Sequence, residues 1–145
     1  MSTRTQDFLS NFLAAAASCD ADRVVDCFAS DCRFDLPVHP ARGFVGREQA
    51  RRNWSTIFET VPDLSIELLD AAHHGDTCWA ELKYSGTRTD GSPHLMHGVI
   101  VVTVDAESRL SRARFYVEFV DSSEVSITEH LEAMQDSAHI AAGRP

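Results

Sequence analysis

The sequence is poor in the features that mark membrane, secreted or disulfide-bonded proteins. No apolar run approaches the roughly 20 residues of a membrane span, and the start of the chain has no signal-peptide core. The four cysteines form no C-x-x-C pair and lie among apolar residues, so we expect buried thiols and not a disulfide framework. These absences favour a cytoplasmic protein with no membrane partner.

Patterns for binding metals and polyanions are also missing. There is no H-x-H or H-E-x-x-H motif, and the adjacent His73 and His74 would point to opposite faces of a strand. We therefore expect no metal and no other cofactor. The 22 acidic residues outnumber the 13 Lys and Arg residues, and the resulting charge of -9 argues against nucleic acid as a partner. Small molecules and other proteins remain as partners.

The segments that are present predict one domain with helices at both ends. A chain of 145 residues with 43% hydrophobic residues can bury most of its apolar surface. Capping patterns predict helices after Thr3, Asp20 and Ser126, and an apolar stripe predicts a longer helix over Arg47–Thr60, ended by Pro62. We expect a single domain over residues 1–145, with a core of about 5–121 and a C-terminal helix of about 127–140.

Beyond Pro62 the apolar period changes from helical to alternating. A short strand is expected at 33–36, and further strands are expected at 64–68, 77–88, 95–104 and 110–120. The almost wholly apolar segment 95–104 should be covered on both faces. Helices and strands that are segregated in this way predict an α+β fold. The expected architecture is a cone, a curved antiparallel sheet around the long helix, with a small-molecule cavity at its open end.

The last expected strand has one polar and one aromatic face. Tyr116 and Glu118 share a face with Arg114, because side chains alternate along a strand, and Phe115, Val117 and Phe119 fill the other. If the polar face lines the cavity, a hydrogen-bond donor stands beside a proton acceptor. If it faces water, the strand is an ordinary solvated one. Our functional hypothesis requires the phenol and the carboxylate to lie inside.

Three segments of the chain resemble the SnoaL-like members of the nuclear transport factor 2-like superfamily. These are Gly46–Asp63, Trp79–Glu81 with Gly86-Thr87, and Arg114–Glu118, and the resemblance spans roughly Phe8 to Asp121. It implies a cone into which an aromatic residue and an acid of the last strand project; the family acid is often Asp where this chain has Glu118. The superfamily includes ketosteroid isomerases, polyketide cyclases, limonene-type epoxide hydrolases, dehydratases and non-catalytic binders.

Four residues are candidates for catalysis. Glu118 could act as the base or water activator, because a dry pocket raises the pKa of a carboxyl group. Tyr116 and His97 could polarise a substrate oxygen, and Asp35 could supply a second carboxylate at the cone mouth. Each residue also has a structural alternative. Glu118 could hydrogen-bond Tyr116 or form an ion pair with an arginine. His97 could be a buried residue that bonds a neighbour, and Asp35 could simply form a turn.

Further side chains are candidates for substrate contact. Glu81 and Trp79 lie on the same face of one strand, and His97 shares that face if the 89–93 turn pairs residues of equal parity. The alternative is that these side chains form a row that is exposed or faces the second subunit of a dimer. His39 would lie at the cone mouth or be simply solvated. Aromatic residues are expected to line or floor the cavity, although core packing would also explain Trp54. The expected substrate-binding residues are Phe34, His39, Trp54, Trp79, Glu81, Tyr84 and Arg114.

Two functions remain open at this point. The first is a cofactor-independent enzyme that performs acid–base chemistry (cyclisation, isomerisation, dehydration or epoxide opening) on a hydrophobic, oxygenated small molecule. The second is a non-catalytic ligand-binding or assembly module. In both cases we expect a homodimer, because a second apolar sheet face is usually buried by a partner.

Overall fold

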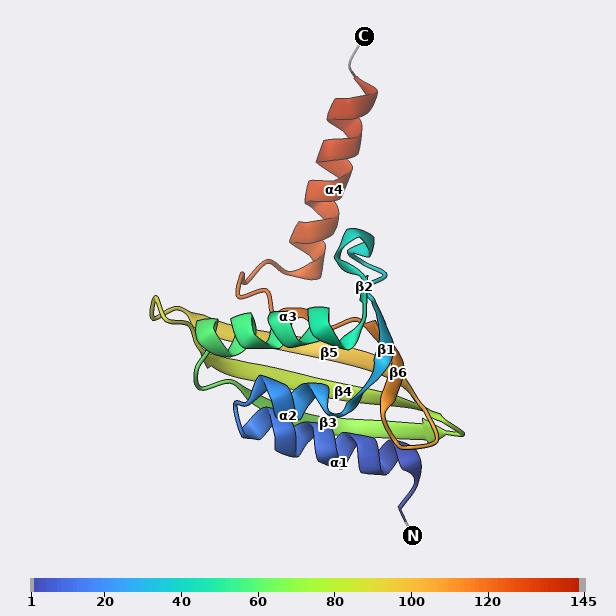
Figure 1. Cartoon of the computed structure of the whole chain (residues 1–145). Helices are drawn as coiled ribbons and strands as arrows, with labels where there is room; N and C mark the ends of the chain where they lie inside the picture. The colour runs from blue at the N-terminus through green and yellow to red at the C-terminus, as the bar shows by residue number, and fades with distance from the viewer. Residues whose placement is uncertain (1, 144–145) are drawn as a thin grey trace.

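The computed structural model describes residues 2–143, which fold into four α-helices, a short 3₁₀ turn and seven strands (Figure 1). The elements in chain order are α1 Arg4–Ala17, α2 Ala21–Val25, β1 Phe28–Asp35, η1 Pro40–Arg42, β2 Phe44–Val45, α3 Arg47–Thr60, β3 Ser65–His74, β4 Thr77–Thr87, β5 Pro93–Val104, β6 Leu110–Phe115, β7 Glu118–Phe119 and α4 Ile127–Ala142.

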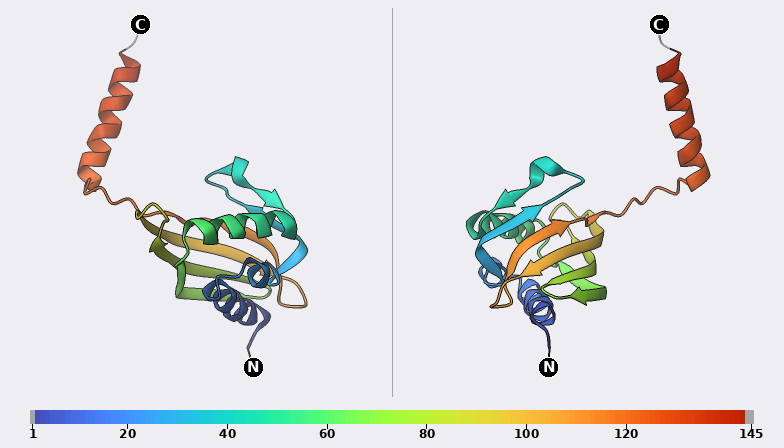
Figure 2. Two further views of the ribbon diagram at one scale, coloured as in Figure 1. Left: turned by 60° about the vertical axis from the view of Figure 1, so that its left-hand side comes forward. Right: turned by 90° about the vertical axis from the view of Figure 1, so that its right-hand side faces the viewer.

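The strands form one curved, unclosed sheet in the order β2-β1-β6-β5-β4-β3, with β7 paired to β5. Strands β3 to β6 are an antiparallel meander, whereas β1 lies parallel to β6. Helices α1, α2 and α3 cover the concave face of the sheet, as two further views show (Figure 2). This architecture confirms the expected α+β fold with a curved sheet around a long helix.

The helices begin where the sequence predicts. The Thr3 side chain accepts from the backbone N–H of Gln6, whose own side chain accepts from the Thr3 N–H, so a capping box opens α1. The Asp20 side chain caps α2 by accepting from the backbone N–H of Asp22. α3 begins after Gly46, whose φ of 101° suits a residue without a Cβ atom.

Apolar side chains from the three helices and the inner sheet face form one core. α3 contributes Ala50 and Trp54, and α1 contributes a stacked pair, Phe8 and Phe12. The sheet contributes the even-numbered residues of β4 and β5, among them Leu82 and Val102, both fully buried. Even-numbered residues of these two strands therefore face the helices, and odd-numbered residues face outward.

The expected last strand is interrupted at Gly98 of β5. A Cβ atom on Gly98 would lie 2.2 Å from the carbonyl oxygen of Tyr116 and 2.6 Å from the Cα of Val117. The segment between β6 and β7 therefore runs beside β5, in the register that both strands share, and so close to it that only glycine fits at position 98. As a result, the continuous strand expected over 110–120 is two shorter strands.

Two expectations about burial are wrong. β5 was expected to be covered on both faces, but Leu95 and His97 lie exposed on its outer side in the single chain. Cys19 is exposed, because it follows the end of α1 with a left-handed φ of 54°. The other three thiols, Cys27, Cys32 and Cys78, are buried and free as expected.

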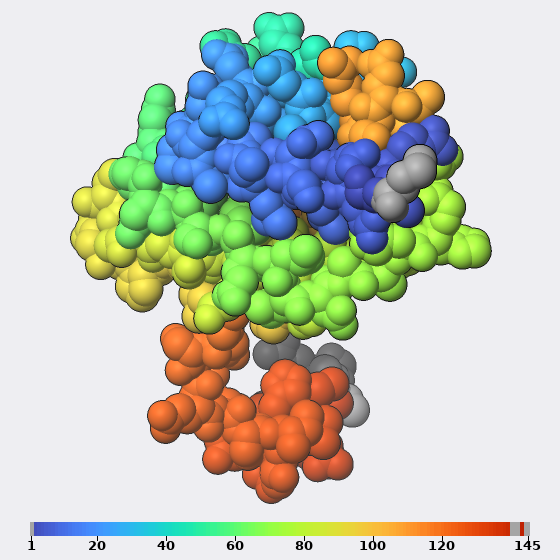
Figure 3. All heavy atoms as spheres, turned by 90° about the horizontal axis from the view of Figure 1, so that it is seen from below, coloured from blue at the N-terminus to red at the C-terminus, as the bar shows by residue number. Residues whose placement is uncertain are grey.

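Helix α4 extends away from the rest of the molecule after an exposed linker (Figure 3). Its side chains make no hydrogen bond or ion pair with residues 2–120 in the described part of the chain. Ile127, Leu131 and Met134, which lie on one side of the helix, are all exposed. No helix among the described residues is long and apolar enough to cross a membrane.

Candidate functional site

A cavity of about 440 Å³ opens between the C-terminal half of α3 and the inner sheet face. Such a volume lies within the range of ordinary small-molecule sites, roughly 300–1,000 Å³. Most of its wall is apolar or aromatic. Its lining residues are Thr56, Ile57, Thr60, Val61, Tyr84, Arg88, His94, Met96, Phe115 and Phe119.

The strand register places Tyr84 and His94 on the same wall. Tyr84 pairs with Met96, and His94 lies two residues before Met96 on the same face of β5. Such a diagonal pair has Cα atoms about 7–8 Å apart, so a small molecule can touch both side chains. Tyr84 is buried, and its hydroxyl forms no hydrogen bond to any residue within 2–143. Burial raises the pKa of this phenol well above its usual value, so it remains a neutral donor.

His94 is a neutral imidazole with one enclosed nitrogen. Burial and the nearby Arg88 lower its pKa, because both disfavour a second positive charge. The Nδ1 atom is buried and has no hydrogen-bond partner among the described residues. A ligand cannot reach this enclosed nitrogen, whereas Nε2 can act toward a ligand as a donor in one neutral tautomer and as a proton acceptor in the other. Nε2 is then the atom available to a ligand.

Phe119 stands at the mouth of the cavity between two nitrogen-bearing side chains. The edge of its ring meets the His94 ring, with centroids 5.3 Å apart and planes at 87°. The guanidinium of Arg88 lies 5.1 Å from the centroid of Phe119, which is within cation–π range. Phe119 thus positions both groups, although 56% of its own surface is exposed.

The expected aromatic floor lies behind the cavity and is largely core. Tyr84 meets Phe115 edge to face at 6.4 Å, and both also border a second, apolar void of about 40 Å³. Trp54 and Phe34 line that inner void but not the larger cavity. Tyr84 is therefore the expected aromatic residue that reaches the larger cavity, whereas packing accounts for Trp54 and Phe34.

The polar face of the last strands lies outside the cavity, which contradicts the requirement stated above. Glu118 is the ladder partner of His97, an outward-facing residue, whereas Phe119 pairs with Met96 of the cavity wall. Tyr116 is 37% exposed and does not line the cavity. The alternation in the sequence correctly separates a polar from an aromatic face of the last strands, but the aromatic face points into the cavity. The physical reason is that Phe115, Val117 and Phe119 gain more from burial than a phenol and a carboxylate.

The outer face gathers most of the other predicted residues. His97 Nε2 lies 2.8 Å from Glu81 Oε2, so the turn does pair residues of equal parity, but this pair lies outside the cone. His39 Nε2 lies 2.9 Å from Glu118 Oε1. All four side chains of these pairs are between 33% and 45% exposed.

The remaining predicted residues also lie outside the cavity. Asp35 forms ion pairs with Arg33 at 3.2 Å and with Arg112 at 3.3 Å. The carboxylate that was expected to be the second catalytic acid is therefore engaged by two arginines. Arg114 is the ladder neighbour of Asp35. Trp79 borders a shallow depression of about 210 Å³ on the outer face, together with Glu81.

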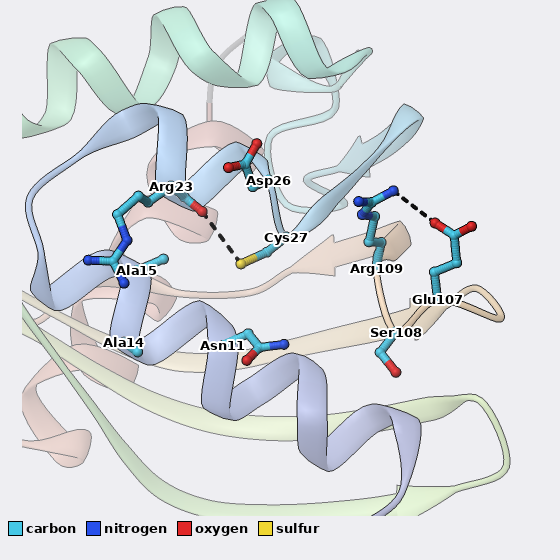
Figure 4. A pocket seen from close by; sticks show the side chains of 9 residues that line it. All are labelled: Asn11, Ala14, Ala15, Arg23, Asp26, Cys27, Glu107, Ser108 and Arg109. Atoms are coloured by element: carbon cyan, nitrogen blue, oxygen red, sulfur yellow. Dashed lines mark hydrogen bonds and ion pairs between the residues drawn. The ribbon is translucent and has the colours of Figure 1, made fainter.

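A fourth hollow, of about 410 Å³, lies between α1, α2 and the β5–β6 turn (Figure 4). Its wall is polar, and its charged side chains are two arginines and two acids, Arg23, Arg109, Asp26 and Glu107. Arg109 already bonds Glu107 at 2.8 Å. Burial raises the pKa of the Cys27 thiol, which donates to the Arg23 carbonyl. These balanced charges and the protonated thiol favour a solvent-filled groove.

Sequence reasoning missed His94 and Arg88. Both flank the 89–93 turn, where Pro93 and Gly91 suggest only a loop. The parity of β5 could have placed His94 on the inward face with Met96, because both are even-numbered. Arg88 gives no comparable signal, since its position follows the end of β4. No group of three or more metal-binding side chains occurs within the described residues.

The sequence model of the SnoaL-like domain matches residues 9–113. The chain therefore belongs to the SnoaL-like family. No curated protein matches the sequence.

Solved structures with the same fold share little sequence with this chain. A ketosteroid isomerase-like protein from Catenulispora acidiphila, in complex with trimethylamine, is 16% identical over 83% of this chain and 91% of that chain, with a TM-score of 0.69. A SnoaL-like protein of unknown function from Burkholderia thailandensis is 17% identical over 83% and 98%, with a TM-score of 0.64. At such identities the likeness shows the fold alone.

Proposed function

We propose that the protein binds a hydrophobic, oxygen-bearing small molecule in the cavity between α3 and the inner sheet face. The cavity carries this proposal, because its volume, its aromatic wall and its few polar groups match small-molecule sites. The polar groups that would meet a ligand oxygen are the Tyr84 hydroxyl and the His94 ring.

We further propose that this ligand undergoes acid–base chemistry of the SnoaL-like kind without a cofactor. A neutral His94 can accept a proton at physiological pH, and the Tyr84 phenol can donate a hydrogen bond to an oxygen that gains negative charge. The reaction class is isomerisation, cyclisation, dehydration or epoxide opening. His94 takes the role that the sequence suggested for Glu118.

The binding step is tested with the neutral fluorophore N-phenyl-1-naphthylamine. Thr60→Trp places an indole at the cavity mouth, and we expect it to reduce probe affinity at least about tenfold. Glu59→Trp is the matched control, because Glu59 is the preceding, exposed residue of α3 and does not line the cavity. Equal affinity of the wild type and Thr60→Trp would show that the probe binds elsewhere and would refute the binding site.

The catalytic step is tested by turnover of ketone, polyketide-like and epoxide substrates. His94→Gln should lower kcat by about 100- to 10,000-fold if the ring transfers a proton. Glu118→Gln should leave kcat unchanged, because its carboxylate lies on the outer face. Loss of turnover in Glu118→Gln with normal turnover in His94→Gln would return the chemistry to the outer face.

Exposed apolar side chains on the outer face favour a second candidate function, assembly through that face. Trp79, Leu95 and Tyr116 are each 37–39% exposed there. A homodimer would bury them. Trp79→Glu should then shift the protein to monomer in sedimentation or light-scattering measurements. An unchanged mass would exclude Trp79 from the interface.

A further inference from the structure

We infer that the cavity selects a ligand with an acidic oxygen group, which Arg88 binds at the mouth while the apolar body of the ligand occupies the interior. This inference rests on the proposed binding function and adds the charge and orientation of the ligand. A ring-bearing carboxylate or sulfonate has the chemistry required.

The charges of the cavity wall point to an anion. Arg88 is the one lining residue with a full charge, since His94 is held neutral, and no Asp or Glu is among the lining residues. A positive group without a negative counterpart favours an anionic over a cationic ligand. The acid-rich composition of the chain makes the lack of a carboxylate here notable, because 22 acidic residues are available.

The guanidinium of Arg88 is not occupied by the protein. It forms no ion pair with any carboxylate in the part of the chain that the structure describes. The nearest acid in sequence is Asp90, whose pKa is lowered mainly by hydrogen bonds from Ser92 and to a smaller extent by Arg88. The Asp90 carboxylate accepts from the backbone N–H and the hydroxyl of Ser92, at 2.9 and 2.6 Å, and forms no ion pair with Arg88. The hydrogen-bond donors of Arg88 are therefore available to a ligand.

The position of the guanidinium suits a ligand that is apolar at one end. Arg88 lies against the Phe119 ring at the mouth, whereas the opposite end of the cavity reaches Tyr84 and Phe115 beside the aromatic core. A guanidinium matches the planar geometry of a carboxylate and binds it through two parallel hydrogen bonds. Contact with the ring keeps the guanidinium in place before the ligand arrives.

The two threonines of the wall agree with this orientation. Thr56 and Thr60 donate their hydroxyl protons to the carbonyls of Arg52 and Thr56, at 3.1 and 2.8 Å. Their oxygens then present lone pairs to the cavity and offer no donor to an anion. Arg88 is left as the strong donor for an acidic group, apart from the His94 ring on the other side of Phe119 and the Tyr84 hydroxyl deeper in the wall.

The test compares two fluorophores that differ by one charged group. 8-Anilinonaphthalene-1-sulfonate carries a sulfonate on the skeleton of the neutral N-phenyl-1-naphthylamine. Arg88→Gln should weaken the affinity of the full-length protein for the sulfonate about tenfold or more, as expected for a hydrogen bond to a charged group. It should change the affinity for the neutral probe less than twofold. Arg88→Lys should recover part of the loss, because it keeps the charge.

A matched control removes the same charge elsewhere. Arg52→Gln changes an exposed arginine of α3 that lies outside the cavity, so it should leave the affinity for both probes unchanged. If Arg52→Gln and Arg88→Gln weakened the affinity for the sulfonate probe equally, the loss would come from the changed net charge of the protein, and the inference would be overturned. An unchanged sulfonate affinity in Arg88→Gln, with neutral-probe binding still blocked by Thr60→Trp, would overturn this inference and leave the binding site intact. Failure of both probes to bind would refute the proposed binding function itself.

Discussion

Gly98 offers the sharpest test of how the sheet is built. A Cβ atom at this position would lie 2.2 Å from the Tyr116 carbonyl oxygen and 2.6 Å from the Val117 Cα. Both are backbone atoms, so no side-chain rotation can relieve the contact. Because real Cβ contacts essentially never fall below 3.0 Å, Gly98→Ala must move the β6–β7 segment by about 0.8 Å.

The expected cost follows from that displacement. Overpacking by one methyl group costs about 1–3 kcal/mol, and the lower entropy of the unfolded chain returns about 0.4–1 kcal/mol. Because the clash is with backbone atoms, we take the upper end of the overpacking cost, about 3 kcal/mol, which leaves a net loss of about 2 kcal/mol in the free energy of unfolding. The displaced segment carries Phe119, so the affinity for N-phenyl-1-naphthylamine should also fall.

Urea unfolding with an unchanged m-value measures the stability term. Gly86→Ala is the matched comparison, because the closest contact of its Cβ atom, at 2.5 Å, is with the side chain of Val61. Val61 lines the cavity, which gives its side chain space to turn, so the loss should be smaller than in Gly98→Ala. A Gly98→Ala protein as stable as the wild type, with unchanged probe affinity, would show that the segment does not lie this close to β5.

Three further predictions concern single side chains. Thr5 is fully buried, and its hydroxyl lies 2.7 Å from His73 Nδ1. Thr5→Val should therefore lower the free energy of unfolding by about 1 kcal/mol and Tm by about 2–4 °C in calorimetry. An unchanged Tm would mean that this hydrogen bond contributes nothing to stability. The pKa of His94 is lowered from 6.5 in the folded state, so the unfolded chain binds the proton first as the pH falls through 6.5, and stability decreases on acidification. The decrease in the free energy of unfolding between pH 7 and 5 should be smaller in His94→Gln. Identical pH profiles of the two proteins would contradict the lowered pKa. Burial raises the pKa of Cys78 to about 11. A thiol reagent should therefore label the exposed Cys19 in the native protein and reach the fully buried Cys32 and Cys78 only after unfolding. Rapid native labelling of Cys78 would contradict its burial.

Local chemistry in the sequence was enough to predict the helices and the meander. Thr3 with Gln6, Asp20 and Pro62 act within one helical turn, so their effect does not depend on distant contacts. The register across the 89–93 turn was left open by the sequence; the structure pairs residues of equal parity and so brings Glu81 to His97, but on the outer face.

Which face of the sheet becomes the inside was decided only by the tertiary structure. The alternation over Leu110–Val120 separates aromatic from polar side chains, but both faces can line a cavity until the helices choose one. The parallel pairing of β1 with β6 joins segments about 80 residues apart and has no local signal. The same holds for the meeting of Arg88, His94 and Phe119, which depends on the pairing of β7 with β5. Local propensities therefore determined the elements, and long-range packing determined the site.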